Sequence, residues 1–208
     1  MSRRFAADDP AALAALTAAV RAGDLVVVPT ETVYGIACAL ADAAVQRLLA
    51  AKGRPASKGI TLLIDDLSDA AELVDAPPAA VASAARFWPG PLTLVLPVRR
   101  GVRLPEAVTG GGQAVGLRVP DQPLVRALAR ELGPLPLTSA NRSGEPDARS
   151  ADEAEAALGE AVAVVVDGGP SPGGRPSTVV AFDADGGWRI LRPGPIAAEA
   201  LGLKGSGH

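Results

Sequence analysis

The stretch VVVPTETVYGIACAL, residues 26–40, passes from three valines into Pro-Thr-Glu-Thr and then Val-Tyr-Gly. The valines predict a short buried strand, which ends at Pro29 because proline has no N–H to donate to a neighbouring strand. The single tyrosine of the chain, Tyr34, follows at once, with two threonines and the carboxylate of Glu31 beside it. Polar residues at the end of a buried strand are either a plain strand terminus or part of a binding site, and other segments must decide between the two.

Helices and further strands are predicted on both sides of this stretch. Start and stop signals predict a helix from Pro10 to Ala22 with Asp9 as its cap, and another from Pro123 to Leu132 with Asp121 as its cap. Residues 42–51 also have a helical pattern, and the capping-box spacing of Ser150 and Glu153 predicts a short helix at 154–158. Strands are expected at residues 24–30, 59–64, 92–98, 114–120, 163–167, 177–182 and 188–194.

The order of these elements predicts an α/β fold. Helices and strands alternate, though not strictly, and several links between strands are too short for a crossover helix, which indicates a mixed sheet. A length of 208 residues fits one domain. We expect a single domain over 1–208, with its core at about 8–196 and a frayed tail at 203–208.

Composition excludes several classes of protein. The apolar runs are broken well before the roughly 20 residues that a membrane span needs, and no apolar segment follows the arginines near the start. A soluble, cytoplasmic protein is therefore expected. The net charge of −3 argues against a general nucleic-acid coat. Cys38 is the single cysteine, which excludes an internal disulfide and argues against a zinc site.

The sequence also lacks the residues of the common catalytic motifs. The one histidine is the terminal His208, so triads and histidine-based metal sites are not expected. Neither GxxxxGK[ST] nor GxGxxG occurs, and the GGG at 110–112 precedes a predicted strand, so it cannot open a helix under a phosphate. An enzyme built from this chain would work by positioning and electrostatics.

Four short segments collect side chains that bind anions. They are KGRPASKG (52–59), GLRVP (116–120), TSANRSG (138–144) and the pair RPST and LRPG (175–178 and 191–194). Any single Lys or Arg among them is most simply a solvated charge. Arg118 differs, because a strand arginine among apolar neighbours must reach solvent or find an anion. Cationic groups together with hydroxyls suit a ligand rich in phosphate and carboxylate oxygens.

Taken in order, the motifs PTETVYG, KGRP, FWPGPLT, LRVP, SANRSG and STVV…LRPG resemble the threonylcarbamoyl-AMP synthase family, also called YrdC-like. The resemblance runs from about Leu25 to Gly194. It implies a twisted sheet around a large, positively lined cavity. It also implies the reaction of L-threonine, bicarbonate or CO2, and ATP to L-threonylcarbamoyl-adenylate and pyrophosphate, which serves the N6-threonylcarbamoyl modification of adenosine 37 in tRNA.

The resemblance implies roles for residues in each part of the site. The threonine-binding residues would be Thr32, Tyr34, Arg118 and Ser177. The ATP-binding residues would be Lys52, Arg54, Lys58, Ser139, Asn141, Ser143 and Arg192. Lys52, Arg54 and Arg118 would act in catalysis, no residue would ligate a metal, and Mg²⁺ would arrive with ATP. Trp88 is expected in the core, with a rigid turn at 89–91.

Two departures from the family pattern stand out. Leu63 occupies a position where many members have a histidine, so one substrate contact is missing. The chain ends soon after LRPG, which indicates the short bacterial type without a C-terminal domain. The resemblance further implies downstream tRNA threonylcarbamoyl-transfer proteins as partners, a weak contact with tRNA, and no membrane. Whether the loop at 168–176 closes over the ligand stays open, as does the general base, for which Glu31 is the nearest candidate.

Two other functions remain as alternatives. An RNA-binding or ribosome-assembly factor could use the same basic cavity without catalysis, although aromatic residues, which stack on bases, make up just 3% of the chain. A carbamoyl-adenylate former for another acceptor occurs as a domain of hydrogenase maturation proteins. That relative has zinc fingers, whose cysteines are missing here.

Overall fold

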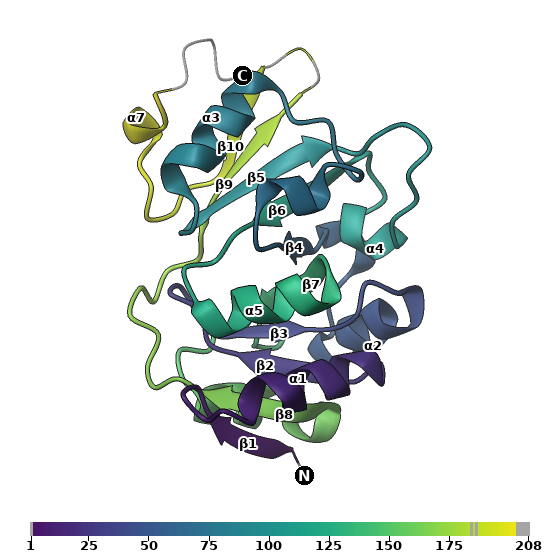
Figure 1. The fold of residues 1–208 in the computed structure, drawn as a ribbon, viewed down its shortest axis with the longest axis vertical. Helices are drawn as coiled ribbons and strands as arrows, with labels where there is room; N and C mark the ends of the chain where they lie inside the picture. The colour runs from purple at the N-terminus through teal and green to yellow at the C-terminus, as the bar shows by residue number, and fades with distance from the viewer. Residues whose placement is uncertain (1, 184, 186, 203–208) are drawn as a thin grey trace.

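The computed structural model describes residues 2–183, 185 and 187–202, and its centre is a ten-stranded sheet (Figure 1). The strands are β1 Arg3–Ala6, β2 Leu25–Val28, β3 Gly35–Ala37, β4 Thr61–Leu63, β5 Leu92–Pro97, β6 Ala114–Arg118, β7 Leu135–Ser139, β8 Val162–Asp167, β9 Thr178–Phe182 and β10 Trp188–Arg192. The helices are α1 Ala12–Arg21, α2 Asp42–Lys52, α3 Pro78–Phe87, α4 Glu106–Thr109, α5 Pro123–Leu132, α6 Ala151–Leu158 and α7 Ala198–Leu201, with 3-10 turns at Ala56–Lys58, Leu67–Ala70 and Gly159–Ala161.

The sheet is mixed, which confirms the predicted fold class. Its strand order is β1-β8-β2-β3-β7-β4-β6-β5-β9-β10, with parallel pairs such as β2 and β8 beside antiparallel pairs such as β2 and β3. Val28 at the end of β2 pairs with Gly35 at the start of β3. Residues 29–34, which follow the valines, are therefore a hairpin loop at the ends of two interior strands of the sheet.

Helices cover both faces of the sheet, but one face incompletely. Val26 and Val28 pack in a cluster with α1 and α5, whereas Val27 faces a second cluster that includes α2, α3 and α6. This alternation follows from the period of two along a strand. Figure 1 shows α1 and α5 against the half of the sheet that contains β2, β3 and β8. The hydrophobic cluster that contains α1 and α5 extends to Leu63 and Leu137. Both of these residues also line a pocket over the half of the sheet that α1 and α5 do not cover.

The starts of two helices differ from the prediction. The first helix begins at Ala12, two residues later than expected, because Asp9 accepts the N–H of Ala11 at 2.8 Å in a turn before the helix. For α5 the cap is Gln122 and not Asp121, since the Gln122 amide oxygen accepts the N–H groups of residues 124 and 125 at 2.7 and 3.2 Å. The amide side chain of Gln122 thus takes the capping role that was predicted for Asp121, the residue before it.

The predicted cap at Ser150 is confirmed. Its hydroxyl accepts the N–H of Glu153 at 3.2 Å. The Glu153 carboxylate, however, accepts from the N–H of Arg149 at 2.7 Å, one residue before the position that a capping box requires.

The strands β1, β3 and β7 and the helices α3, α4 and α7 were not predicted. The most informative is β7, a central strand that contains Pro136 between its neighbours β3 and β4. Proline is uncommon inside a sheet because it lacks a donor, so PLPLTS has the pattern of a turn. The sheet tolerates it here because Pro136 still accepts the N–H of Cys38 through its carbonyl.

The chain after β10 returns to the start of β9. The Thr178 hydroxyl donates to the carbonyl of Ile196 at 2.9 Å and accepts its N–H at 3.0 Å.

Trp88 is half-buried against the core, as expected, and its indole N–H donates to the carbonyl of Leu92 at 2.7 Å. The expected tail at 203–208 lies outside the described residues, and the single-domain boundaries stay a prediction. Among the described helices, none is both long and apolar enough to cross a bilayer.

Gly194 should tolerate no side chain. A Cβ there would lie 2.3 Å from the backbone N of Thr178 and 2.6 Å from the carbonyl carbon of Ser177, and backbone cannot move aside as a side chain can. Gly194→Ala is expected to lower the free energy of unfolding by about 1 to 3 kcal/mol, as overpacking does in cores. Urea denaturation measures this.

Gly112→Ala is the matched control. A Cβ at this exposed position comes no closer than 3.4 Å to the carbonyl of Thr109, so its unfolding free energy should stay within about 0.5 kcal/mol of the parent protein. Equal stability of the two variants would show that the close approach at Gly194 is relieved at little cost.

Candidate functional site

A pocket of about 370 Å³ lies over the part of the sheet that α1 and α5 leave uncovered. Its floor comes from alternate residues of β4, β5 and β6 and from one residue of β9, and its rim comes from loops far apart in the sequence. Four cationic side chains line it: Arg54, Lys58, Arg118 and Arg192. Asp147 is the one carboxylate among the described residues that line it. The hydroxyl residues of its wall are Thr30, Thr32, Thr61, Thr93, Thr109, Thr138, Ser139 and Ser177.

Arg118 is the most extensively held of these cations. It ends β6, is 6% exposed, and its Nε donates to the carbonyl of Gly90 at 3.1 Å. Its Nη2 donates to Glu31 Oε1 at 2.6 Å and to Thr32 Oγ1 at 3.1 Å. The turn at 89–91 and the hairpin loop at 29–34 therefore fix one guanidinium from two sides.

Arg54 and Lys58 belong to the loop after α2. Arg54 Nη2 donates to the carbonyls of Lys58 and Gly59 at 2.6 and 2.7 Å, which folds the loop around its own guanidinium. Burial, and then the nearby charge of Arg192, hold the pKa of Arg54 below its usual range. Its Nε is buried and finds no acceptor among the described residues.

Arg192 lies at the mouth of the pocket. Its Nε and Nη2 donate to the carbonyl and the hydroxyl of Ser177, each at 3.1 Å. The side chain as a whole is exposed, yet partial burial of the guanidinium lowers the pKa of Arg192, Asp147 raises it, and Arg118 lowers it again. Arg192 is therefore close enough to both Arg54 and Arg118 for its positive charge to interact with theirs.

Ser177 connects the two cationic regions. Its hydroxyl lies 2.8 Å from the hydroxyl of Thr93, and both side chains are buried. Thr93 was not predicted as a site residue. Leu94 on β5 lies opposite Leu117 on the antiparallel strand β6, so Thr93 lies opposite Arg118. The pairing of these two strands would have identified Thr93 as a site residue, but the sequence alone does not give it.

Lys52 lies behind the pocket and does not line it. It is 2% exposed, and its ammonium donates to the carbonyls of Ser139 and Asn141 and to Asn141 Oδ1, the last at 3.2 Å. Burial and the charge of Arg54 lower the pKa of Lys52 to about 8. Three oxygen acceptors nevertheless surround the ammonium, which favours its charged form at neutral pH.

Asn141 and Ser143 belong to the same support. Asn141 accepts a hydrogen bond from the Ser139 hydroxyl at 2.5 Å and donates to the carbonyl of Glu145 at 2.6 Å. The N–H of Ser143 donates to the carbonyl of Lys52 at 2.8 Å. Ser139 lines the pocket. Lys52, Asn141 and Ser143 do not, and they support the turn on which Ser139 lies.

Tyr34 is buried and also lies outside the lining. Its hydroxyl donates to the carbonyl of Gly169 at 2.7 Å and accepts the N–H of Gly168 at 3.0 Å, and burial raises its pKa. Tyr34 therefore anchors the loop at 168–176. Further along this loop, Gly173 and Gly174 donate to the carbonyls of Glu31 and Thr32 at 3.1 and 2.9 Å. The loop is thus hydrogen-bonded onto the hairpin loop beside the pocket.

Leu63 lies next to Arg118 across the parallel pair of β4 and β6. It lines the pocket and offers no hydrogen bond to a ligand. Asp147 is a second residue that sequence reasoning missed. It follows SANRSGEP and belongs to no motif that the sequence offers. The folded structure is what places it in the wall of the pocket.

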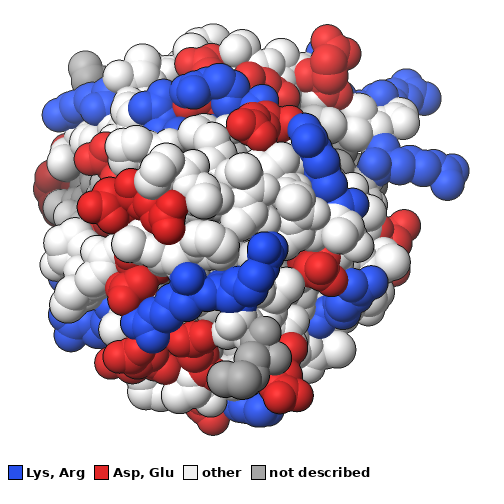
Figure 2. All heavy atoms as spheres, turned by 60° about the horizontal axis from the view of Figure 1, so that its bottom comes forward, with Lys and Arg blue, Asp and Glu red and all other residues white. Residues whose placement is uncertain are grey.

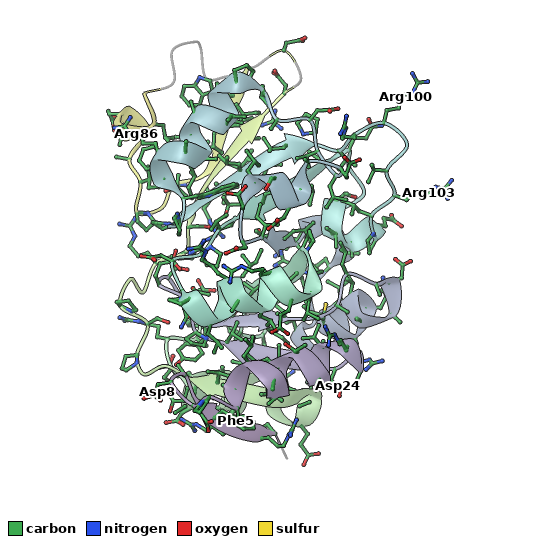
Figure 3. The ribbon with its side chains drawn as sticks, viewed as in Figure 1. Phe5, Asp8, Asp24, Arg86, Arg100 and Arg103 are labelled. Atoms are coloured by element: carbon green, nitrogen blue, oxygen red, sulfur yellow. The ribbon has the colours of Figure 1, made fainter. Side chains whose placement is uncertain are left out.

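No group of three or more potential metal ligands occurs in the part of the chain that the structure describes. Figure 2 shows Lys and Arg interspersed with Asp and Glu on the face that it views, and Figure 3 shows Arg100 and Arg103 directed away from the body of the protein.

The chain is similar to proteins of one family over most of its length. The family model Sua5_yciO_yrdC, described as "Telomere recombination", matches residues 18–194. The threonylcarbamoyl-AMP synthase of Bacillus subtilis is 41% identical over 192 residues, which cover 91% of this chain and 55% of that protein. A putative threonylcarbamoyl-AMP synthase of Mycobacterium tuberculosis is 41% identical over 189 residues, which cover 88% of this chain and 84% of that protein.

A solved structure agrees with these sequences. The crystal structure of P. abyssi Sua5 complexed with L-threonine superposes with a TM-score of 0.86 at 34% identity, covering 97% of this chain and 59% of that one. The chain thus spans little more than half the length of the B. subtilis and P. abyssi proteins.

Lys52 should matter for stability even without a ligand. Lys52→Met removes the ammonium that donates to the carbonyls of Ser139 and Asn141, while Asn141 Oδ1 keeps its bond from the Ser139 hydroxyl, so the free energy of unfolding is expected to fall by about 2 to 3 kcal/mol. Lys58→Met is the matched control, because the Lys58 side chain is exposed and should change the value by less than about 0.5 kcal/mol. Urea denaturation of both ligand-free variants provides the test, and an unchanged Lys52→Met would mean that the turn at 139–143 holds without the ammonium.

Proposed function

Because the chain belongs to the Sua5/YciO/YrdC family, which confirms the resemblance found in its motifs, we propose that it is an L-threonylcarbamoyladenylate synthase. It would form L-threonylcarbamoyl-AMP and pyrophosphate from L-threonine, bicarbonate or CO2, and ATP. Its relatives from two bacteria carry the name threonylcarbamoyl-AMP synthase, one of them as putative, and the P. abyssi neighbour was crystallised with L-threonine. These names support the proposal.

The observation that carries it is the gathering of Arg54, Lys58, Arg118 and Arg192 in one pocket with a single carboxylate among the described lining residues. Like charges in a partly buried space repel one another, and burial first, then the charge of Arg192, lower the pKa of Arg54. A polyanion removes that repulsion when it binds. The buried Nε of Arg54, which has no partner among the described residues, offers one further donor to such a ligand.

The two ends of the pocket suit the two substrates. The Arg54, Lys58 and Arg192 end would hold the triphosphate, with Ser139 at the junction. The Arg118 end would bind the threonine carboxylate, with Thr32 and Ser177 beside it. These assignments keep the roles predicted from the sequence, except that Tyr34, Lys52, Asn141 and Ser143 would act by supporting neighbouring loops.

The reaction would then depend on alignment and charge. A carbamate formed on the threonine amine attacks the α-phosphorus of ATP, the new oxygen–phosphorus bond forms, and pyrophosphate leaves with the electrons of the broken bond. Fixed guanidinium groups stabilise the growing negative charge without having to reorganise. Arg54 and Arg192 are held by backbone carbonyls before any ligand arrives, which suits this role.

Mg²⁺ would enter as part of the substrate complex. The described residues form no cluster of three carboxylate or imidazole ligands, and Asp147 is the one lining carboxylate among them. Magnesium in such sites keeps several waters and binds the substrate phosphates together with one or two carboxylates. The protein would therefore need to supply at most Asp147.

The remaining parts of the proposal follow from the activity. The reaction belongs to the nucleotidyltransferases and would take place in the cytoplasm, and the product would pass to the proteins that transfer the threonylcarbamoyl group to tRNA. Pyrophosphate release, with ATP, threonine and bicarbonate each omitted in turn, tests the activity directly. Salt-sensitive RNA binding without any pyrophosphate release would instead favour the RNA-binding alternative.

Arg118→Lys should separate the two substrate ends. It keeps a positive charge against Glu31 but loses Nη1, the guanidinium nitrogen that donates to no described residue and can therefore donate to a ligand carboxylate. The KM for threonine is expected to rise about ten- to a hundredfold, while the KM for ATP stays within about threefold. Steady-state pyrophosphate release measures both constants.

Arg100→Lys is the control for this pair, because Arg100 points away from the body of the protein (Figure 3). It should leave both constants unchanged. If Arg118→Lys raised the KM for ATP as much as that for threonine, the carboxylate would not bind at Arg118.

A further inference from the structure

Asp167 ends β8 and does not line the pocket, yet its carboxylate lies where the loop at 168–176, here called the glycine loop, begins. Its Oδ1 accepts the N–H of Gly169 at 2.9 Å and is 3.4 Å from the hydroxyl of Tyr34. Its Oδ2 accepts from Arg4 Nη2 at 2.7 Å. Arg4 first, and then the Gly169 N–H, hold the pKa of the Asp167 carboxyl below its usual range, so it is charged at neutral pH.

The first residues of the glycine loop are fixed against the hairpin loop at 29–34. The N–H of Gly168 donates to the Tyr34 hydroxyl at 3.0 Å, and that hydroxyl donates to the carbonyl of Gly169 at 2.7 Å. A Cβ at Gly168 would come within 2.9 Å of the Pro29 ring. Pro29 and Tyr34 are the two ends of the hairpin loop, so the glycine loop begins in contact with both.

The other end of the glycine loop leads into the pocket. Gly173 and Gly174 donate to two carbonyls of the hairpin loop at 3.1 and 2.9 Å. Directly after the glycine loop, Ser177 lines the pocket, and its hydroxyl accepts from Arg192 Nη2 at 3.1 Å. Figure 1 shows the connection from β8 to β9 running along the side of the molecule. A shift where the glycine loop begins therefore changes the position at which Ser177 reaches the pocket.

Arg4 belongs to β1, which lies beside β8 at the end of the sheet (Figure 1). The backbone holds this segment without the Arg4 side chain, since the N–H of Ala7 donates to the carbonyl of Asp167 at 2.8 Å. Arg4 Nη1 donates to Asp152 and Glu155 of α6 at 2.5 and 3.1 Å, while Nη2 donates to Asp167. Because Arg4 occupies Oδ2 of Asp167, it orients the carboxylate so that Oδ1 is left to Gly169.

These contacts run without a break from β1 to the wall of the pocket, and we infer that Arg4 and Asp167 are positioning residues of the site. Arg4 orients Asp167, Asp167 fixes the start of the glycine loop, and the glycine loop sets the position of Ser177. Arg4 lies outside residues 18–194, which the family model matches, so this support comes from a part of the chain that the model does not cover.

The effect on catalysis rests on the proposed function, in which Ser177 belongs to the threonine side, but the positioning can be tested without any activity. Amide hydrogen exchange of the ligand-free protein, followed by mass spectrometry, reports on the glycine loop. The N–H groups of residues 168, 169, 173 and 174 are all hydrogen-bonded in the structure, so loosening of the loop speeds their exchange.

Asp167→Asn is the first variant. It keeps the size of the side chain but replaces one acceptor oxygen with an NH₂ group, so either Arg4 or Gly169 loses its partner. The Arg4 and Asp167 side chains are 39% and 37% exposed, and an ion pair at such exposure is modest. Exchange in the glycine loop should therefore rise about two- to fivefold, with exchange in α5 unchanged. Arg4→Met should have the same effect.

Asp152→Asn is the matched control, because it removes a carboxylate from the other nitrogen of the same guanidinium. It should leave exchange in the glycine loop unchanged. The double variant of Arg4→Met with Asp167→Asn should show no faster exchange than either single variant, as expected for two residues that act through one contact.

Steady-state pyrophosphate release gives a second measurement. Arg4→Met should raise the KM for threonine about two- to fivefold, and Arg4→Lys, which keeps the charge against Asp167, should restore most of it. Faster exchange with an unchanged KM in an active enzyme would overturn the inference, because the glycine loop would then not set the site.

Three exchange results would also overturn it. Faster exchange confined to β1 would mean that Arg4 holds its own strand alone, additive effects would mean that the two residues act separately, and an unchanged glycine loop would mean that neither one positions it. Should Asp167→Asn not fold, Arg4→Met on the exposed edge strand decides the matter. A loosened glycine loop in a protein that releases no pyrophosphate would leave the positioning standing while the proposed function fails.

Discussion

The site depends on the burial of one guanidinium in the face of a sheet. Arg118 ends a central strand, and at 6% exposure its charge must be neutralised inside the protein. The carbonyl of Gly90, the carboxylate of Glu31 and the hydroxyl of Thr32 do this from two separate segments. Because the guanidinium needs all of them, the turn at 89–91 and the loop at 29–34 are brought to the same end of β6. The loop at 168–176 is then fixed in turn, since its glycines donate to the backbone of the loop at 29–34. A single buried charge thus orders three connections that are distant in sequence.

Much of the fold could be predicted because it follows from local patterns. The valines of β2 and β8, the stop glycines and the cap at Ser150 each act over a few residues, and the structure has them where expected. β3 and β7 could not be predicted in this way. Gly35 and Pro136 disfavour a strand locally, and both are accommodated because neighbouring strands and the carbonyl of Pro136 provide the pairing that their own sequence does not indicate.

The same distinction applies to the site. Arg118 could be predicted from its own surroundings, because a strand cation among apolar residues requires either solvent or an anion nearby, whereas Arg54 and Arg192, which line the same pocket, were assigned through the resemblance to the family. What the sequence could not indicate was which polar residues face the pocket and which support it from behind. Lys52 and Ser139 are close in the folded chain, yet the ammonium of Lys52 is directed to carbonyls and Ser139 lines the cavity. That choice depends on the curvature of the turn at 139–143, a tertiary property with no signature in sequence spacing.

The two ends of the pocket are linked by short polar contacts. Arg192 donates to Ser177, Ser177 contacts Thr93, and Thr93 lies on β5, the strand next to Arg118 on β6. These contacts cross β5, β6, β9 and β10, whose spacing hydrogen bonds fix at about 4.8 Å from strand to strand. The distance between the cation at the mouth and the cation on the floor is therefore set by the sheet and not by flexible loops. An enzyme that joins a carboxylate-bearing substrate to a phosphate benefits from such a fixed distance, because alignment of the two reactants is then established when the protein folds.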